Sequence, residues 1–217
     1  MESLNKYIEH TLLKQDAKES DLIKLFDEAK ENNFFGVCVN PCYVQLAKEN
    51  LSGSEVNIVT VIGFPLGANT TDVKVYETQK AIKDGADEID MVINVTKVKD
   101  RQTNYIVDEI KAIKNACGEH NLKVIIETDL LDKDEIKYAC ECSIKGGADF
   151  VKTSTGFVKN GVGAKAEDVE LMFNTVKDSG LRVKASGGIQ DRETAVAMIK
   201  SGAVRLGTSS GVKIVKC

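Results

Sequence analysis

The chain has 217 residues, of which 42% are hydrophobic and 29% are charged, and its formal net charge is −4. This balance excludes a disordered chain, and it lacks the basic excess that is typical of nucleic-acid-binding proteins. No run of about 18 apolar residues predicts a membrane span, and residues 1–14 hold no apolar segment typical of a secretory signal. We therefore expect a cytoplasmic globular protein without a membrane or nucleic-acid partner.

The cysteines do not form a recognisable metal or disulfide motif. They contain no CxxC pair, and the histidines, His10 and His120, are not spaced as ligands. In the cytoplasm thiols stay reduced, so we predict free thiols and no metal or other cofactor. The residues concerned are Cys38, Cys42, Cys117, Cys140, Cys142 and Cys217.

Short β-branched runs alternate with longer amphipathic stretches along the chain. The runs predict strands at residues 7–11, 35–39, 57–62, 88–93, 123–127, 149–153, 182–185 and 204–207. Residues 21–29, 134–144 and 166–176 have the apolar spacing of helices. Asp16 and Asp132 are each followed by Glu three residues later, which resembles a capping box. This alternation predicts a parallel sheet.

A Gly-Ala step recurs where a helix gives way to a strand, at Gly85, Gly147 and Gly202. Glycine takes the left-handed conformation that ends many helices. Eight βα units fill the chain, so we predict an α/β fold, a single-domain (β/α)8 TIM barrel over residues 1–217. The alternative is an open doubly wound sheet, which usually has fewer strands.

Alternate residues of a barrel strand face the helices and the barrel interior. In the run 88–93, Ile89, Met91 and Ile93 form the apolar set, so Asp90 faces inward. The same alternation turns Lys152 and Lys184 inward. It also places Cys38, Asn40 and Glu127 on the inner face. We expect nearly all other charged residues on the surface.

Two lysines and one carboxylate are costly to bury unless they are paired or functional. Two ammonium groups side by side disfavour each other, which favours a neutral amine on one of them. A neutral amine in a desolvated pocket attacks carbonyl groups. Two interpretations remain open on this basis, a Schiff-base enzyme and an ion-pair network that fills the barrel.

Glycine-rich segments follow the last two predicted strands, at residues 186–188 and 207–211. The loops after strands seven and eight of such barrels often bind phosphate through backbone amides. Turns also need glycine for their own geometry. We favour a phosphate site, which needs no basic excess in the chain as a whole.

Several stretches together resemble deoxyribose-phosphate aldolases. Those most specific to this family are Phe-Val-Lys-Thr-Ser-Thr-Gly at 150–156 and Val-Lys-Ala-Ser-Gly-Gly at 183–188. Further matches are Ile-Glu-His-Thr-Leu-Leu at 8–13, Val-Cys-Val-Asn-Pro at 37–41, and residues 61–67, 88–94, 124–128 and 207–212. The resemblance runs almost from end to end of the chain.

The resemblance implies a class I aldolase that reversibly cleaves 2-deoxy-D-ribose 5-phosphate to D-glyceraldehyde 3-phosphate and acetaldehyde, in deoxyribose phosphate catabolism. Lys152 would form the Schiff base, and Asp90 and Lys184 would transfer protons. The implied enzyme needs no metal or cofactor and forms a homodimer. The phosphate of this sugar substrate would bind at Gly156, Gly187, Gly188, Gly207, Ser209 and Ser210.

Four residues depart from the pattern common in the family. Glu9 replaces Asp, which affects fine positioning, and Asp129 replaces an uncharged residue with an effect that the sequence does not explain. Gln190 stands where Arg is frequent and Phe157 where some members have Lys. Both of these changes remove a cation near the predicted phosphate site.

Four further residues near the predicted site have two interpretations each. Thr155 joins the proton relay or shapes its loop, and Asn40 binds substrate hydroxyls or, as we favour, caps the helix at Pro41. Cys38 is a target for unsaturated aldehydes or, as we favour, a packing residue. We expect His10 to be hydrogen-bonded in the barrel wall rather than catalytic.

Two alternative functions stay open. One is another Schiff-base lyase of this barrel class that acts on a different phosphorylated sugar. The other is a non-catalytic barrel that binds a phosphorylated metabolite and uses its lysines as counter-charges. Borohydride trapping of the Schiff base separates the second from both enzymes.

Overall fold

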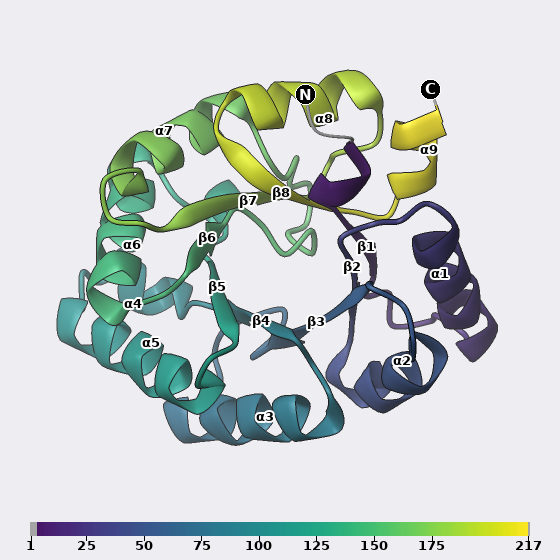
Figure 1. Cartoon of the computed structure of the whole chain (residues 1–217). Helices are drawn as coiled ribbons and strands as arrows, with labels where there is room; N and C mark the ends of the chain where they lie inside the picture. The colour runs from purple at the N-terminus through teal and green to yellow at the C-terminus, as the bar shows by residue number, and fades with distance from the viewer. Residues whose placement is uncertain (1–3, 217) are drawn as a thin grey trace.

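The structure is a computed structural model that describes residues 4–216. Eight parallel strands close into a barrel in chain order, with β8 paired to β1 (Figure 1). The strands are β1 (Ile8–Leu12), β2 (Gly36–Val39), β3 (Asn57–Ile62), β4 (Glu88–Val92), β5 (Asn121–Ile125), β6 (Phe150–Lys152), β7 (Arg182–Ser186) and β8 (Ala203–Thr208). The predicted (β/α)8 barrel is therefore confirmed, and the open sheet is wrong.

Helices surround the barrel on its outside (Figure 1). In the described residues they are α1 (Glu19–Glu31), α2 (Val44–Asn50), α3 (Thr71–Asp84), α4 (Val95–Lys99), α5 (Thr103–Cys117), α6 (Lys133–Gly146), α7 (Ala166–Val176), α8 (Arg192–Lys200) and α9 (Gly211–Lys216). Short 3-10 turns are η1 (Leu4–Tyr7), η2 (Pro41–Tyr43) and η3 (Thr128–Leu130). Within residues 4–216, no helix has the length and apolar character needed to cross a membrane.

Element boundaries follow the sequence pattern closely. The predictions for 57–62 and 166–176 coincide with β3 and α7. β5 lies two residues earlier than predicted, because Glu127 adopts a left-handed conformation with φ of 62° and cannot continue a strand. The three Gly-Ala joints are confirmed, since all three glycines have positive φ.

One of the two predicted capping boxes is present. The Asp132 carboxylate accepts from the Glu135 amide at 2.8 Å, and the Glu135 carboxylate accepts from the Asp132 amide at 2.8 Å. The box at Asp16 is wrong, because α1 begins three residues later. There the Asp21 carboxylate accepts from the Lys18 amide at 2.9 Å and satisfies one of the free donors at the helix start.

The apolar core lies between the strands and the helices, whereas the barrel interior is largely polar. Ile89, Met91 and Ile93 are all fully buried in the outer core, as their alternation predicts. Each such side chain contributes about 1.5–3 kcal/mol of burial free energy. A small inner cluster holds Cys38 with Val59, which confirms the inward placement of this cysteine.

Arg205 and two phenylalanines fill the barrel at the end where its strands begin. The Arg205 guanidinium lies 3.2 Å from the ring centroid of Phe35 and 5.5 Å from that of Phe150. Phe150 is fully buried, and Arg205 is 7% exposed. These cation–π contacts cover a charge that would otherwise be costly to bury. The opening toward solvent is at the other end of the barrel, where the strands finish.

Candidate active site

The strand register brings Asp90, Lys152 and Lys184 together inside the barrel. Lys152 on β6 is the direct partner of Lys184 on β7, so both side chains leave the sheet on the same face. One oxygen of Asp90, Oδ2, accepts from Lys152 Nζ at 2.8 Å and from Lys184 Nζ at 2.6 Å. The three residues that the sequence singled out thus form one contact cluster.

Four further charged residues extend this cluster, so the expectation that nearly all other charges are exposed is wrong here. Lys184 also bonds Glu9, whose second oxygen accepts from Arg205 at 2.9 Å. Lys123 Nζ lies 2.9 Å from Asp90 Oδ1 and 2.6 Å from Glu88. Arg205 also contacts Glu88 at 3.2 Å.

The same alternation that places Asp90 inside the barrel also predicts an inward position for these residues. Glu88 precedes Asp90 by two positions, and Lys123 has the same parity as Glu127. Glu9 alternates with two outer residues of β1, Ile8 and His10. A charged residue at an inward position of a barrel strand therefore indicates membership of the buried network.

The network holds one more cation than it holds carboxylates. Its cations are Lys123, Lys152, Lys184 and Arg205, and its carboxylates are Glu9, Glu88 and Asp90. Lys152 contacts a single carboxylate in this network, that of Asp90, which it shares with two other lysines. It is therefore the least compensated lysine of the cluster.

The pKa shifts follow from these contacts. Burial opposes the charged form of Lys184, but the Asp90 and Glu9 carboxylates outweigh it and raise the pKa of this ammonium. Burial likewise opposes the Asp90 carboxylate, yet Lys123, Lys152 and Lys184 hold its pKa well below the usual range. Asp90 and Lys184 therefore stay charged at neutral pH.

The absence of a side chain at Gly207 makes room for Lys184. A Cβ at this position would lie 3.2 Å from Cε of Lys184 and 3.0 Å from Cβ of Ser186. Both distances are tighter than ordinary van der Waals contact. Packing against Lys184 and Ser186 therefore explains why position 207 is a glycine, whether or not a ligand binds there.

A cavity of about 400 Å³ opens above Lys152 at the end of the barrel where the strands finish. Its lining is Thr11, Leu12, Leu13, Lys14, Lys152, Ser154, Thr155, Gly156, Phe157, Ser186, Gly187, Gly188, Ile189, Gln190, Gly207, Thr208 and Ser209. It thus gathers five of the six predicted phosphate-binding residues around the predicted nucleophile. The sixth, Ser210, lines a neighbouring hollow instead, and its amide donates to the Thr208 hydroxyl at 2.9 Å.

Acidic side chains fix the loop between β6 and α7, which forms one wall of this cavity. The buried Glu127 carboxylate accepts from the amide of Thr155 at 3.0 Å and from its hydroxyl. Burial raises the pKa of Glu127. The Asp129 carboxylate accepts from the amides of Val162 at 3.2 Å and Gly163 at 2.8 Å. The departure at Asp129 therefore has a structural role in anchoring this loop.

The glycines at 187 and 188 are required by the same loop. A Cβ on Gly188 would lie 2.3 Å from the carbonyl oxygen of Val162, and Gly187 has φ of 83°. The Gly187 carbonyl accepts from the Ala164 amide at 3.1 Å. Close packing of two loops thus explains these glycines, and it also leaves the cavity wall made of backbone.

The remaining candidates lie beside the cavity. Asn40 does not cap η2 with its side chain, so that prediction is wrong; its amide donates to the Leu13 carbonyl at 3.3 Å instead. Burial raises the pKa of the Cys38 thiol to about 11, which agrees with a packing residue. His10 faces outward and pairs with Glu28 at 2.8 Å, as expected for a wall residue.

One set of residues in the barrel has the composition of a metal site. Ligand atoms of Glu9, Cys38 and Asp90 lie within 4.8 Å of one another. The Lys184 ammonium bonds both carboxylates, so the protein itself supplies the positive charge that balances them. The cysteines at 38, 42, 117, 140 and 142 are free thiols, and Cys217 lies outside the described residues.

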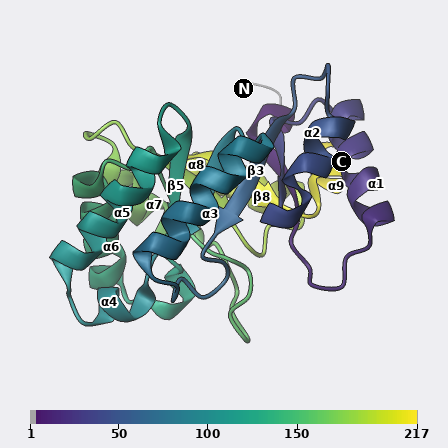
Figure 2. The same ribbon diagram turned by 90° about the horizontal axis from the view of Figure 1, so that it is seen from below.

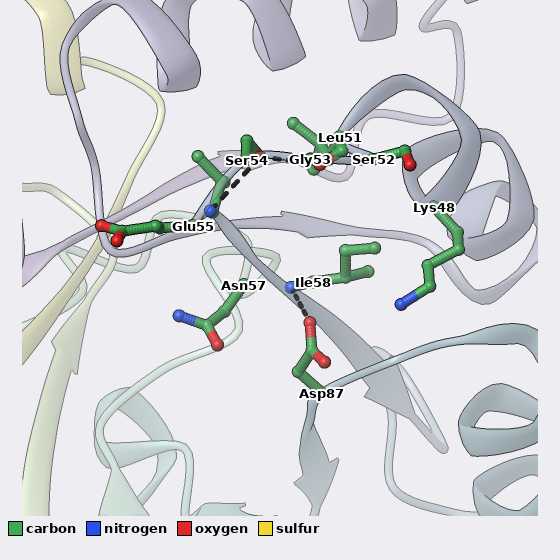
Figure 3. A pocket seen from close by; sticks show the side chains of 10 residues that line it. Lys48, Leu51, Ser52, Gly53, Ser54, Glu55, Asn57, Ile58 and Asp87 are labelled. Atoms are coloured by element: carbon green, nitrogen blue, oxygen red, sulfur yellow. Dashed lines mark hydrogen bonds between the residues drawn. The ribbon is translucent and has the colours of Figure 1, made fainter.

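A separate hollow of about 350 Å³ lies where β3 and β4 begin, which is the end of the barrel opposite the cavity above Lys152. Figure 3 shows the side chains that line it. Lys48 and Asn57 border it, together with Asp87 and the loop before β3. The Asp87 carboxylate accepts from the Ile58 amide at 2.8 Å and so serves the backbone. The charged network opens toward the other end, which makes the cavity above Lys152 the candidate active site.

Comparison with known proteins matches residues 4–216 to the DeoC/LacD family aldolase. A deoxyribose-phosphate aldolase from Finegoldia magna is 56% identical over 213 residues, which cover 98% of this chain and 99% of the relative. One from Mannheimia succiniciproducens is 54% identical over 215 residues, with 99% and 95% covered.

Solved structures give the same result. A deoxyribose phosphate aldolase from Aeropyrum pernix, described as a tetramer, has a TM-score of 0.89 at 33% identity and covers 98% of this chain and 89% of its own. The closed barrel, the buried lysines and the similarity to these relatives together identify the protein as an enzyme of the aldolase class. The chain belongs to the DeoC/LacD aldolase family.

Proposed function

We propose that the protein is a class I aldolase that cleaves 2-deoxy-D-ribose 5-phosphate to D-glyceraldehyde 3-phosphate and acetaldehyde. The observation that carries this proposal is Lys152, an inward lysine at the floor of a glycine-walled cavity and 2.8 Å from Asp90. The relatives named deoxyribose-phosphate aldolase support the choice of substrate.

In the proposed reaction the Lys152 amine attacks C1 of the open-chain aldehyde, and loss of water gives an iminium. Removal of one proton from Lys152, which this attack requires, leaves three cations facing three carboxylates in the network. The balanced cluster then avoids the cost of an uncompensated buried charge.

The iminium then acts as an electron sink. A base takes the proton of the C3 hydroxyl, the C2–C3 bond breaks, and its electron pair remains on C2 as an enamine while glyceraldehyde 3-phosphate leaves. Protonation of C2 and hydrolysis of the iminium release acetaldehyde and restore Lys152. We assign these proton transfers to a water molecule between the Asp90 carboxylate and the Lys184 ammonium, and the Thr155 hydroxyl, which donates to Glu127, would join the relay as an acceptor.

The phosphate of the substrate would bind the backbone wall at Gly156, Gly187, Gly188 and Gly207 and the hydroxyl of Ser209. A wall of backbone amides favours an anion without a nearby cluster of cations. Ser210 lines the neighbouring hollow and not this cavity, so we leave it out of the proposed phosphate contacts. Asn40 and Cys38, the two further candidates, do not line the cavity: Asn40 bonds the carbonyl of the lining residue Leu13, and Cys38 packs in the inner apolar cluster.

Borohydride trapping tests the proposal directly. Incubation of the native protein with acetaldehyde and borohydride should add one ethyl group to Lys152, as located by peptide mass spectrometry. The buried Lys74 is an internal control that should stay unmodified. The same adduct without turnover of deoxyribose 5-phosphate would indicate another phosphorylated sugar as substrate, and no adduct would indicate a binding protein.

Assembly and location belong to the same proposal. We propose a homodimer that acts in the cytoplasm, as expected for an enzyme of sugar phosphate catabolism. The relative from Aeropyrum pernix is described as a tetramer. Light scattering of the purified protein distinguishes these assemblies, and a monomer would contradict the proposal.

A further inference from the structure

The cavity above Lys152 contains little positive charge for the substrate proposed above. A phosphate monoester carries about 1.5 to 2 negative charges at neutral pH. The cations in the cavity lining are Lys152 and Lys14, and Lys152 is committed to the carbonyl in the proposed reaction. We propose that Lys14 is the cation that binds the substrate phosphate, an inference that rests on the proposed function.

The position of Lys14 agrees with this role. It follows the end of β1 by two residues, and β1 pairs with β8, whose Thr208 is the register partner of His10. The loop of Lys14 therefore emerges beside the loop of Ser209, one of the predicted phosphate-binding residues. Figure 2 shows the loop before α1 and the loop that follows β6 projecting at the same end of the molecule.

Lys14 is also available for a ligand. Within residues 4–216 its ammonium makes no ion pair with a side chain of the protein, and the residue is exposed. Its backbone is held in place, because the Lys14 carbonyl accepts from the Ala17 amide at 3.3 Å. A fixed backbone with an uncommitted side chain is suited to contact an anion at the cavity mouth.

Other nearby residues do not supply this charge. Arg192, at the start of α8, donates to the Ile214 carbonyl at 3.5 Å. Lys213 faces the neighbouring hollow with His10. Gln190 is uncharged, and the Phe157 ring packs against Phe64 with centroids 5.1 Å apart. The cation therefore comes from the β1 loop rather than from the positions at 157 and 190.

The experiment compares phosphorylated and unphosphorylated substrate in three variants. In Lys14→Ala, selectivity for 2-deoxyribose 5-phosphate over 2-deoxyribose should fall about fivefold to tenfold, the size expected for one exposed charge-assisted contact. The loss should appear in KM rather than kcat, because the phosphate does not change in the reaction. Lys14→Arg should restore most of the selectivity.

Lys48→Ala is the matched control, because it removes the same charge from an exposed lysine that borders the hollow where β3 and β4 begin. Figure 3 shows Lys48 beside this hollow. It should leave selectivity unchanged. High salt should weaken binding of the phosphorylated sugar in the native protein more than in Lys14→Ala.

Two outcomes would overturn the role of Lys14. Selectivity equal to that of Lys48→Ala would show that Lys14 does not contact the phosphate, and equal losses on both sugars would show a general structural effect. Borohydride trapping of acetaldehyde on Lys152 needs no phosphate. If the adduct forms in every variant while selectivity is unchanged, the role of Lys14 fails and the proposed aldolase stands; if the native protein forms no adduct, the aldolase itself fails.

Discussion

The molecule buries lysines in two regions, and they differ in how their charges are balanced. Between α3 and α5, Lys74 donates to Glu109 at 2.9 Å and to the Val92 carbonyl at 2.9 Å, and both charged side chains are at most 1% exposed. Inside the barrel, four cations share three carboxylates, and Lys152 lies on the floor of a cavity.

The pKa shifts of the two regions run in opposite directions. Burial lowers the pKa of Lys74 and raises that of Glu109, so burial outweighs the attraction between these two partners. In the barrel, mutual attraction outweighs burial, which raises the pKa of Lys184 and lowers that of Asp90. Burial of a lysine alone therefore does not indicate chemistry; what distinguishes Lys152 is the cavity that opens above it.

The largest expected effect is on the rate of cleavage, which substitution of Lys152 should abolish and substitution of Lys74 should leave nearly unchanged. Lys152→Ala should lose at least about a thousandfold in kcat, because the covalent intermediate cannot form. Lys74→Met should keep kcat within about threefold per folded molecule, since Lys74 does not line the candidate site. Steady-state cleavage assays with circular dichroism as a folding check make the comparison. Substantial activity in Lys152→Ala would remove the Schiff-base assignment.

The second prediction concerns stability. Lys74→Met alone should cost about 3–5 kcal/mol, because it leaves the Glu109 carboxylate buried without a partner. The double variant Lys74→Met with Glu109→Leu should recover much of this loss, because no buried charge remains. Urea unfolding measures both. A single variant as stable as the native protein would mean that this pair contributes nothing to the fold.

The third prediction tests the proton-transfer role of Lys184. Lys184→Leu should slow cleavage about a hundredfold or more, since a general acid or base typically contributes that factor. The variant also leaves Glu9 and Asp90 with fewer cations, so its unfolding free energy should be measured alongside. Borohydride trapping on Lys152 should still proceed slowly. A normal kcat in a folded Lys184→Leu protein would show that Lys184 has no part in catalysis.

The smallest expected effect is the pH dependence contributed by Asp90. Its pKa is lowered in the folded protein, so the unfolded chain takes up a proton first as the pH falls below about 4. Stability from this group is therefore present above the unfolded pKa and lost on acidification, with a slope of up to about 1.4 kcal/mol per pH unit. Asp90→Asn should show a shallower decline of the urea midpoint between pH 6 and pH 3; an equal slope would contradict this contribution.

Much of the barrel could be predicted because its signals are local. A period of two located Asp90, Lys152 and Lys184, and the Gly-Ala steps marked the helix ends. The same period places Glu88 and Lys123 on inward positions of β4 and β5, so their burial also follows from a local pattern.

The loops could not be predicted in this way, because their contacts join residues far apart in the chain. Asp129 fixes the amides of Val162 and Gly163 across more than thirty positions, and no local pattern indicates that pairing. Asn40 similarly bonds the carbonyl of Leu13, which a capping rule does not anticipate. The lining of the cavity depends on such approaches, so only its glycines were visible in the sequence.

The stacked Arg205, Phe35 and Phe150 fill the end of the barrel where the strands begin. In the reaction proposed above, substrate and water would therefore enter through the cavity above Lys152. While glyceraldehyde 3-phosphate occupies that cavity, the proton that the base takes from the C3 hydroxyl would be the one at hand for the enamine carbon. We therefore expect the two halves of the reaction to share a proton that stays inside the site.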